Sequence, residues 1–278
     1  IANCLVGSEM CIRDRQITCL NNISFSNFVK TILIMKKIIT LLAFLICYTG
    51  LSQDPNFLQI TYVKPTPGEN YAQIINENWS KLHQKRIDDG IIVGWDVWWA
   101  MNSTSESDHQ IAIVTLVENI EDFNNNPGIR SVFPDWSDEE FEEFNQKNQA
   151  ARTIVKTDLL AIKNRASKQD SIPNVLVMNY MKVKPVNALA YEKMEDNYKT
   201  SNFENSNRAS WGMAKRIDKY GTGLGWNYMT FDLYNNGAEL MNSRVNTYEY
   251  PAELAKDFEI RDMVYSQPYW KWMALRKE

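Results

Sequence analysis

The hydrophobic positions after residue 57 follow two periodicities in turn. Residues 58 to 64 alternate, with Leu58, Ile60 and Tyr62 on one side, which is typical of a strand with one buried face. Residues 69 to 89 then change to three- and four-residue spacing, which places one apolar stripe along a helix. The pattern therefore predicts a strand followed by a helix.

The chain continues with two β-rich runs and a second helix. Residues 91 to 99 and 110 to 117 are joined by a polar loop and so predict a hairpin. A Ser-Asp-Glu-Glu capping pattern opens a helix at about 137 to 156. A short run at 159 to 162 predicts the last strand. The expected order is strand, helix, strand, strand, helix, strand.

The second half of the chain repeats four landmarks of the first half in the same order. The offset between them shrinks from 120 to 109 residues, as expected if the second copy has shorter loops. The counterpart of the second helix is expected at about 252 to 265, and that of the last strand at 269 to 273. Residues 221 to 225 are expected to form a hairpin loop. The matched landmarks are Val63-Lys64-Pro65 with Val183-Lys184-Pro185, Gly94-Trp95 with Ser210-Trp211, 110 to 119 with 227 to 236, and 152 to 155 with 261 to 264.

Both faces of the hairpin strands are apolar. Trp95 and Val97 lie on one face of residues 91 to 99, yet Ile92 and Trp98 lie on the other. Two helices can cover only one face of such a sheet, so the other face must meet a second apolar surface. We therefore expect an α+β fold of tandem ferredoxin-like βαββαβ repeats, at 53 to 165 and 172 to 278, with sheet packed on sheet.

The first 52 residues are expected to lie outside this fold. Met35 is followed by two lysines and a short apolar run, the pattern of a secretory signal peptide at 35 to 52 that is cleaved before Gln53. Residues 1 to 34 are interpreted as a non-native leader. The sequence thus predicts an exported protein, periplasmic or extracellular, with no stable membrane insertion after cleavage.

The composition of the chain argues against several classes of function. All four cysteines lie in residues 1 to 52, so the mature chain is expected to form no disulfide and no thiolate metal site. The mature chain keeps 25 of the 30 basic and 32 of the 34 acidic side chains, a formal net charge of −7. A nucleic-acid partner, which needs a concentrated basic surface, is therefore not expected.

Several short motifs carry a family resemblance. Tyr62-Val63-Lys64-Pro65, Trp79 with His83 and Arg86, and Gly94-Trp95 resemble the pattern of secreted bacterial proteins of the dimeric α/β-barrel superfamily, which includes NIPSNAP-like, EthD-like and antibiotic-monooxygenase-like groups. The resemblance implies that the two repeats form a dimeric α/β-barrel arrangement within one chain. It also implies cofactor-free oxygenases, isomerases or haem enzymes as candidate activities, and it permits oligomerisation.

His83 is the sharpest catalytic candidate. Trp79, His83 and Arg86 fall at i, i+4 and i+7 on one helical face, where an imidazole beside a cation could act as a base, or as the haem ligand that the resemblance permits. The competing interpretation is a helix stripe packed on the sheet. Asp96 is a third catalytic candidate that could project between the sheets, or could instead pair with a nearby donor.

The aromatic residues suggest a ligand. Tyr62, Trp79 and Trp98 are the candidate ligand-binding residues, whereas other tryptophans are better explained as core. No metal site is expected, because the two histidines, His83 and His109, lack a ligand spacing. No cofactor is required by the motifs.

Three functions remain open at this point. The leading hypothesis is binding of a small apolar or aromatic ligand between the two repeats. The first alternative is a cofactor-free oxygenase, an isomerase or a haem-dependent enzyme that uses His83. The second is a structural envelope protein without a ligand.

Overall fold

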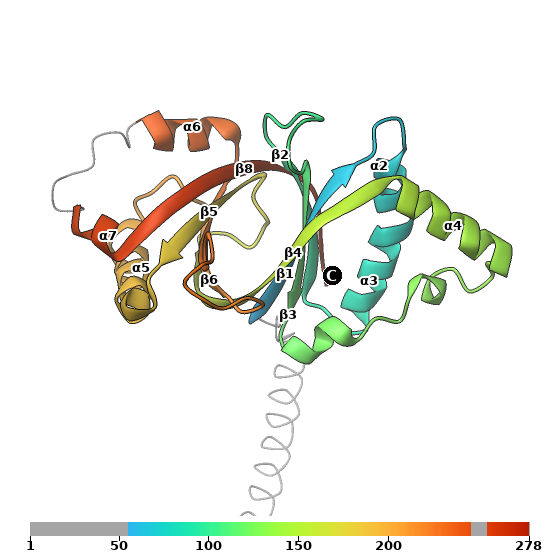
Figure 1. Ribbon diagram of the computed structural model, residues 1–278, viewed down its shortest axis with the longest axis horizontal. Helices are drawn as coiled ribbons and strands as arrows, with labels where there is room; N and C mark the ends of the chain where they lie inside the picture. The colour runs from blue at the N-terminus through green and yellow to red at the C-terminus, as the bar shows by residue number, and fades with distance from the viewer. Residues whose placement is uncertain (1–54, 246–254, 278) are drawn as a thin grey trace, which may run out of the picture. The chain divides into compact units, whose positions relative to one another are not determined.

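Eight antiparallel strands pair edge to edge into one closed barrel in the order β1-β3-β2-β8-β5-β7-β6-β4 (Figure 1). The structure is a computed structural model that describes residues 55–245 and 255–277. The predicted leader and signal peptide lie outside these residues. The strands are β1 (Phe57–Pro65), β2 (Gly94–Ala100), β3 (Ile111–Val117), β4 (Arg152–Ser167), β5 (Val175–Val183), β6 (Ser210–Arg216), β7 (Tyr228–Tyr234) and β8 (Arg261–Arg276).

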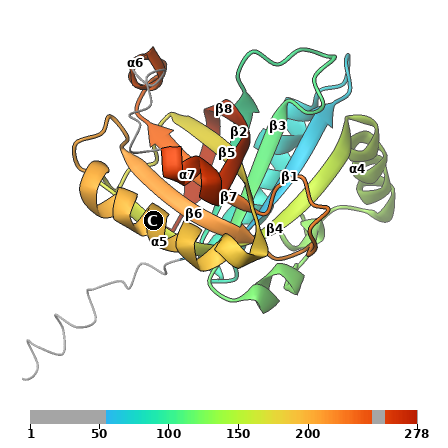
Figure 2. The ribbon, with the colours of Figure 1, turned by 60° about the vertical axis from the view of Figure 1, so that its left-hand side comes forward.

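Helices cover the outside of the barrel. In Figure 1, α2, α3 and α4 lie beside the strands of the first half, and Figure 2 shows α5 and α7 in front of the strands of the second half. Every helix in the described ranges falls short of the length and apolarity that a bilayer crossing requires. The helices are α2 (Tyr71–Ile74), a π-helical turn (Ile75–Trp79), α3 (Ser80–Asp88), α4 (Asp138–Ala150), α5 (Ala188–Asn202), α6 (Gly237–Val245) and α7 (Ala255–Ile260), with 3-10 turns at Ile120–Asn124, Ile129–Ser131 and Pro185–Asn187.

Residues 57–167 and 175–276 have the same strand order, β4-β1-β3-β2 and β8-β5-β7-β6. The irregularities of pairing also match. A bulge follows Tyr62 where β1 pairs with β4, and another follows Tyr180 where β5 pairs with β8. The long strands β4 and β8 join the halves, because each pairs with the first strand of its own half and with the second strand of the other half.

Three of the four landmark pairs lie at equivalent places. Gly94 and Ser210 begin β2 and β6, Arg152 and Arg261 begin β4 and β8, and the third pair leads into β3 and β7. The first landmark pair is shifted by two residues. Strand register makes Tyr62 equivalent to Tyr180, which is 118 residues later rather than the expected distance of 120. An even shift keeps the same side chains on the same face.

The last helix and strand of each half differ from the prediction. Helix α4 ends at Ala150 rather than near 156, and β4 is a 16-residue strand rather than a run of four. The reason is the β-branched sequence Thr153-Ile154-Val155, which favours a strand. In the second half α7 ends at Ile260 and β8 starts at once, whereas we expected helix to 265. Helix α6 was not expected.

The two-sided apolar strands are confirmed, because one face of each sheet points into the barrel and the other lies under helices. Trp95 and Val97 belong to the core beneath α2 and α3, whereas Trp98 and Ala100 belong to the core inside the barrel. The interior core is filled by large side chains that are almost fully buried, namely Ile60, Tyr62, Trp98, Tyr180 and Tyr269. The expected hairpins at 91–117 and around 221–225 are also confirmed.

Candidate functional site at one end of the barrel

Four tyrosines meet at the barrel end where β1 and β5 finish and β4 and β8 begin. We call Tyr62, Tyr180, Tyr265 and Tyr269 the tyrosine cluster. The hydroxyls of Tyr62 and Tyr180 are 2.8 Å apart, and the ring of Tyr265 stacks on that of Tyr180 at 4.0 Å. Burial raises the pKa of all four hydroxyls, so they are neutral donors and acceptors at neutral pH.

His109 connects this cluster to the barrel rim. Its Nε2 lies 2.8 Å from the Tyr269 hydroxyl, and its ring meets the ring of Tyr62 edge to face at 4.8 Å. Burial and, to a smaller extent, the ammonium of Lys156 lower the pKa of His109 to about 4, and Asp108 opposes both. The imidazole is therefore neutral at pH 7, with one ring nitrogen that donates a hydrogen bond and one that accepts.

Lys156 brings a positive charge to the same place. Its Nζ lies 4.4 Å from the centre of the Tyr62 ring and 5.8 Å from that of Tyr180, which is cation–π geometry. The nearest carboxylate oxygen, Oδ2 of Asp158, is 3.7 Å away. The other oxygen of Asp158 accepts from the guanidinium of Arg216, with both side chains buried.

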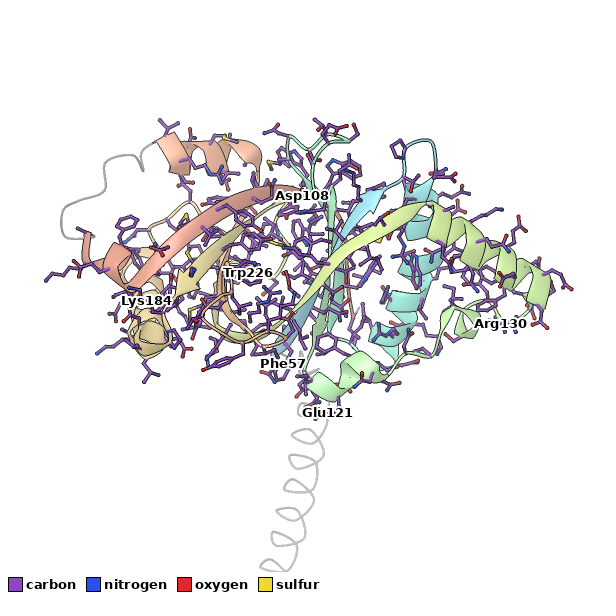
Figure 3. All side chains as sticks on the ribbon, in the orientation of Figure 1. Phe57, Asp108, Glu121, Arg130, Lys184 and Trp226 are labelled. Atoms are coloured by element: carbon purple, nitrogen blue, oxygen red, sulfur yellow. The ribbon has the colours of Figure 1, made fainter. Side chains whose placement is uncertain are left out.

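Trp226 closes the cluster on the side away from His109. Its ring meets Tyr180 edge to face at 5.1 Å, and the guanidinium of Arg216 lies 4.4 Å above it. Figure 3 labels Trp226, at the end of the β6–β7 loop, and Asp108, at the end of the β2–β3 loop. Residues from both halves of the chain thus build one site.

His83 and Arg86 lie elsewhere, on the outer side of the sheet. The imidazole of His83 stacks on Trp95 with ring centres 4.4 Å apart and planes 13° apart, and its Nδ1 is 3.4 Å from a guanidinium nitrogen of Arg86. Burial lowers the pKa of His83 to about 3, with a further contribution from Arg86. This geometry favours the packed helix stripe over a catalytic pair.

Asp96 projects to the opposite face of β2, into the barrel, because side chains alternate along a strand. Both of its oxygens accept from Arg276, at 2.6 and 2.9 Å. The structure therefore does not bring together the three predicted catalytic residues, since Asp96 is separated from His83 by the sheet.

The three predicted ligand-binding residues also lie in different parts of the structure. Tyr62 belongs to the tyrosine cluster. Trp98 is 2% exposed and packs inside the barrel, whereas the indole N–H of Trp79 donates to Asn148 on the outside, beneath α4. Only Tyr62 therefore borders the candidate site.

Sequence reasoning missed most of this site, namely His109, Lys156, Tyr180, Tyr265, Tyr269 and Trp226. One signal was available. A register of 118 residues matches Tyr62 with Tyr180, and a tyrosine at the equivalent position of both halves would have marked that position. His109 gave no such signal, because its partner Tyr269 is 160 residues away.

The residues around His83 do not fit haem. An axial ligand needs a ring nitrogen that faces a flat open space. The imidazole instead lies against Trp95, and Arg86 places a cation beside Nδ1. Within the described ranges no group of three or more His, Cys, Asp or Glu side chains is placed to hold a metal ion.

A surface recess of about 280 Å³ lies outside the barrel, between the π-helical turn and α4. Ile74, Trp136 and Phe144 contribute apolar walls, and Glu77 and Glu143 contribute acidic ones. It shares no residue with the tyrosine cluster.

The position of His83 predicts a pH effect on stability. Its pKa is about 3 in the folded protein against 6.5 in the unfolded chain, so stability is lost as the pH falls through this window. Replacing His83 by phenylalanine keeps a ring on Trp95 and removes the titration. Urea unfolding would be measured at pH 8 and at pH 4.5. Over this interval we expect the unfolding free energy of the wild type to fall by about 2–3 kcal/mol more than that of His83→Phe. Parallel pH profiles of the two proteins would contradict this assignment.

Comparison with solved structures shows the fold. A candidate monooxygenase from Lactobacillus acidophilus NCFM matches with a TM-score of 0.56 and 10% identity, over 80% of this chain and 97% of that chain. A second, from Fusobacterium nucleatum, matches at 0.52 and 10%, over 80% and 95%. An anthrone oxidase-like protein matches at 0.51 and 11%, over 81% and 94%.

No family model and no curated protein sequence matches this chain. At the low identities of the solved structures, the likeness extends to the fold and no further. The chain therefore has the fold of the dimeric α/β-barrel proteins, as the family resemblance implies.

Proposed function

We propose that the protein binds a small apolar or aromatic compound at the tyrosine-cluster end of the barrel, between the two halves of the chain. The observation that supports this most directly is that Lys156 and His109 are half-buried and Tyr265 is exposed, whereas Tyr62, Tyr180 and Tyr269, which they border, are buried. Aromatic rings on both sides of Tyr62 and Tyr180 favour a flat ligand. Because the interior beneath is filled, the ligand occupies the end of the barrel and not its centre.

Thermal unfolding tests this function. The purified protein would be heated with naphthalene derivatives, smaller phenols, aliphatic acids of matched size and sugars. We expect the aromatic compounds to raise the Tm. We also expect Tyr265→Ala to abolish the rise, whereas Trp270→Ala, on the same strand and 45% exposed against 40% for Tyr265, keeps it. The proposal fails if no aromatic compound raises the Tm, or if both variants respond alike.

A second candidate function is an enzyme of the cofactor-free oxygenase or isomerase type. It is favoured by His109, which is neutral at pH 7, as a base must be, and lies at the barrel end hydrogen bonded to a tyrosine hydroxyl. In this version His109 replaces His83 as the base. His109→Phe would abolish turnover of a ligand found in the thermal screen, and His83→Phe would not.

The filled interior supports the third function, an envelope protein without a ligand. The thermal screen separates it from the other two, because a scaffold has no reason to respond to aromatic compounds through Tyr265. If the protein is folded and no compound raises its Tm, the result would favour the scaffold function.

We also propose that the chain is exported and arose by duplication of one ferredoxin-like module, with NIPSNAP-like or EthD-like relatives. The matching strand orders and bulges support duplication. Expression of the full chain in a bacterium, followed by N-terminal sequencing of the protein in each compartment, tests export. The expected outcome is a periplasmic or extracellular product that begins at Gln53.

A further inference from the structure

The ammonium of Lys156 has no hydrogen-bond acceptor among the described residues. Its contacts are the rings of Tyr62 and Tyr180 and the oxygen of Asp158 at 3.7 Å, which is longer than a hydrogen bond. The side chain is 34% exposed. Three donors therefore sit at the end of the barrel, within reach of a ligand.

Asp158 offsets this charge only in part, because it lies 3.7 Å away and is shared with Arg216. It is fully buried, and its Oδ2 has no hydrogen-bond partner among the described residues. At His109 the ammonium of Lys156 lowers the pKa more than Asp108 raises it. A partly uncompensated positive charge therefore lies at the exposed end of the Lys156 side chain.

At equivalent positions the two halves contribute side chains of different chemical character. Lys156 pairs with Tyr62 across β1 and β4 just as Tyr265 pairs with Tyr180 across β5 and β8. His109 precedes β3 by two residues, and Trp226 precedes β7 by two. One side of the site thus carries a cation and an imidazole, and the other carries two aromatic rings.

From this arrangement we infer that the ligand is a planar aromatic anion, an arenecarboxylate or a phenolate. Its oxygen receives hydrogen bonds from the Lys156 ammonium, and its ring lies toward the exposed ring of Tyr265. A phenol that binds as its anion releases its O–H proton to the solvent. This inference rests on the proposed function, and it specifies the charge of the ligand and the residue that anchors it.

Calorimetric titration with three probes of one size tests the inference. 2-Naphthoate, 2-naphthol and neutral 2-naphthamide would be titrated into the protein at pH 8. We expect 2-naphthoate to bind at least about tenfold more tightly than 2-naphthamide, because an ionic hydrogen bond is stronger than a neutral one. Bound 2-naphthol should ionise at a lower pH than free 2-naphthol, which its absorbance spectrum reports.

Lys156→Met should remove the preference for 2-naphthoate and the shift in 2-naphthol ionisation, and Lys156→Arg should keep both in part. The matched control is Lys163→Met, on the same strand, where the ammonium lies 3.7 Å from Glu192 and away from the site. It should bind like wild type. Circular dichroism and the Tm would confirm that each variant is folded.

The outcomes separate the two proposals. If 2-naphthamide binds as well as 2-naphthoate and Lys156→Met changes neither, the inferred anion is wrong and the aromatic site stands. If none of the three probes binds to folded wild-type protein, the aromatic site itself is wrong. A preference for 2-naphthoate that survives Lys156→Met would overturn the assignment of Lys156 as the anchor.

Discussion

Replacing Asp158 by leucine should destabilise the protein by about 2–4 kcal/mol, because the buried guanidinium of Arg216 loses one of its two carboxylates and keeps only Asp218. The side chain of Asp158 is fully buried, and that of Arg216 is 6% exposed. Leucine has the branched shape of aspartate and leaves no cavity, so the loss comes from the missing carboxylate. In urea unfolding at pH 7, the midpoint urea concentration should fall, and the slope of the unfolding free energy against urea concentration should not change.

A double variant separates the charge from the packing. If Arg216 is also replaced, by methionine, no buried charge is left without its counterion inside the barrel, and the apolar pair fills similar space. We expect Asp158→Leu/Arg216→Met to recover most of the lost stability. A double variant as unstable as Asp158→Leu alone would show that the carboxylate acts through another partner, such as Lys156.

The general fold was predictable because each strand carries its own evidence of burial. Trp95 and Trp98 lie out of phase on one strand, so both faces of the sheet had to be covered, and the structure covers one with helices and the other with the second half. The lengths of β4 and β8 were not predictable in this way. Their second partners, β6 and β2, belong to the opposite half of the chain, and local sequence carries no record of that pairing.

The candidate site was less predictable for a related reason. Helical spacing drew attention to His83 because i, i+4 patterns are visible in sequence, although the same pattern describes a packed stripe. The contacts of the tyrosine cluster instead join residues that are far apart in the sequence, as in the 2.8 Å contact of Tyr62 with Tyr180 and the stacking of Tyr180 on Tyr265. Such contacts depend on strand register, and the sequence match had placed that register two residues away.

The two halves also differ in the chemistry of their buried helix positions. Tyr71 and Tyr191 are both buried on a helix that follows the first strand of their half, and four residues later the first half has the fully buried Ile75 whereas the second half has Glu195. Burial raises the pKa of Glu195 to about 7, opposed by Arg261. The same strand order can therefore accommodate an apolar side chain in one half and a titrating one in the other.

Replacing Trp98 by alanine should cost about 3–5 kcal/mol, because it empties the space of an indole ring inside the barrel. Trp98 is 2% exposed and is surrounded by apolar side chains of both halves. The adjacent Trp99 provides the matched control, since it lies on the outer face and is 39% exposed. We expect Trp99→Ala to cost less than about 1 kcal/mol in the same urea unfolding experiment.

The emptied space should also bind the group that it lost. Apolar cavities in proteins accept apolar molecules of matching shape, so added indole should raise the Tm of Trp98→Ala and leave that of Trp99→Ala unchanged. The distinction matters for the proposed site. If indole instead stabilised wild type and Trp98→Ala equally, it would be binding at the barrel end. If Trp98→Ala lost little stability, the side chains of the two halves would not be in contact across the barrel, and the tyrosine cluster, which depends on the same contact, would not form.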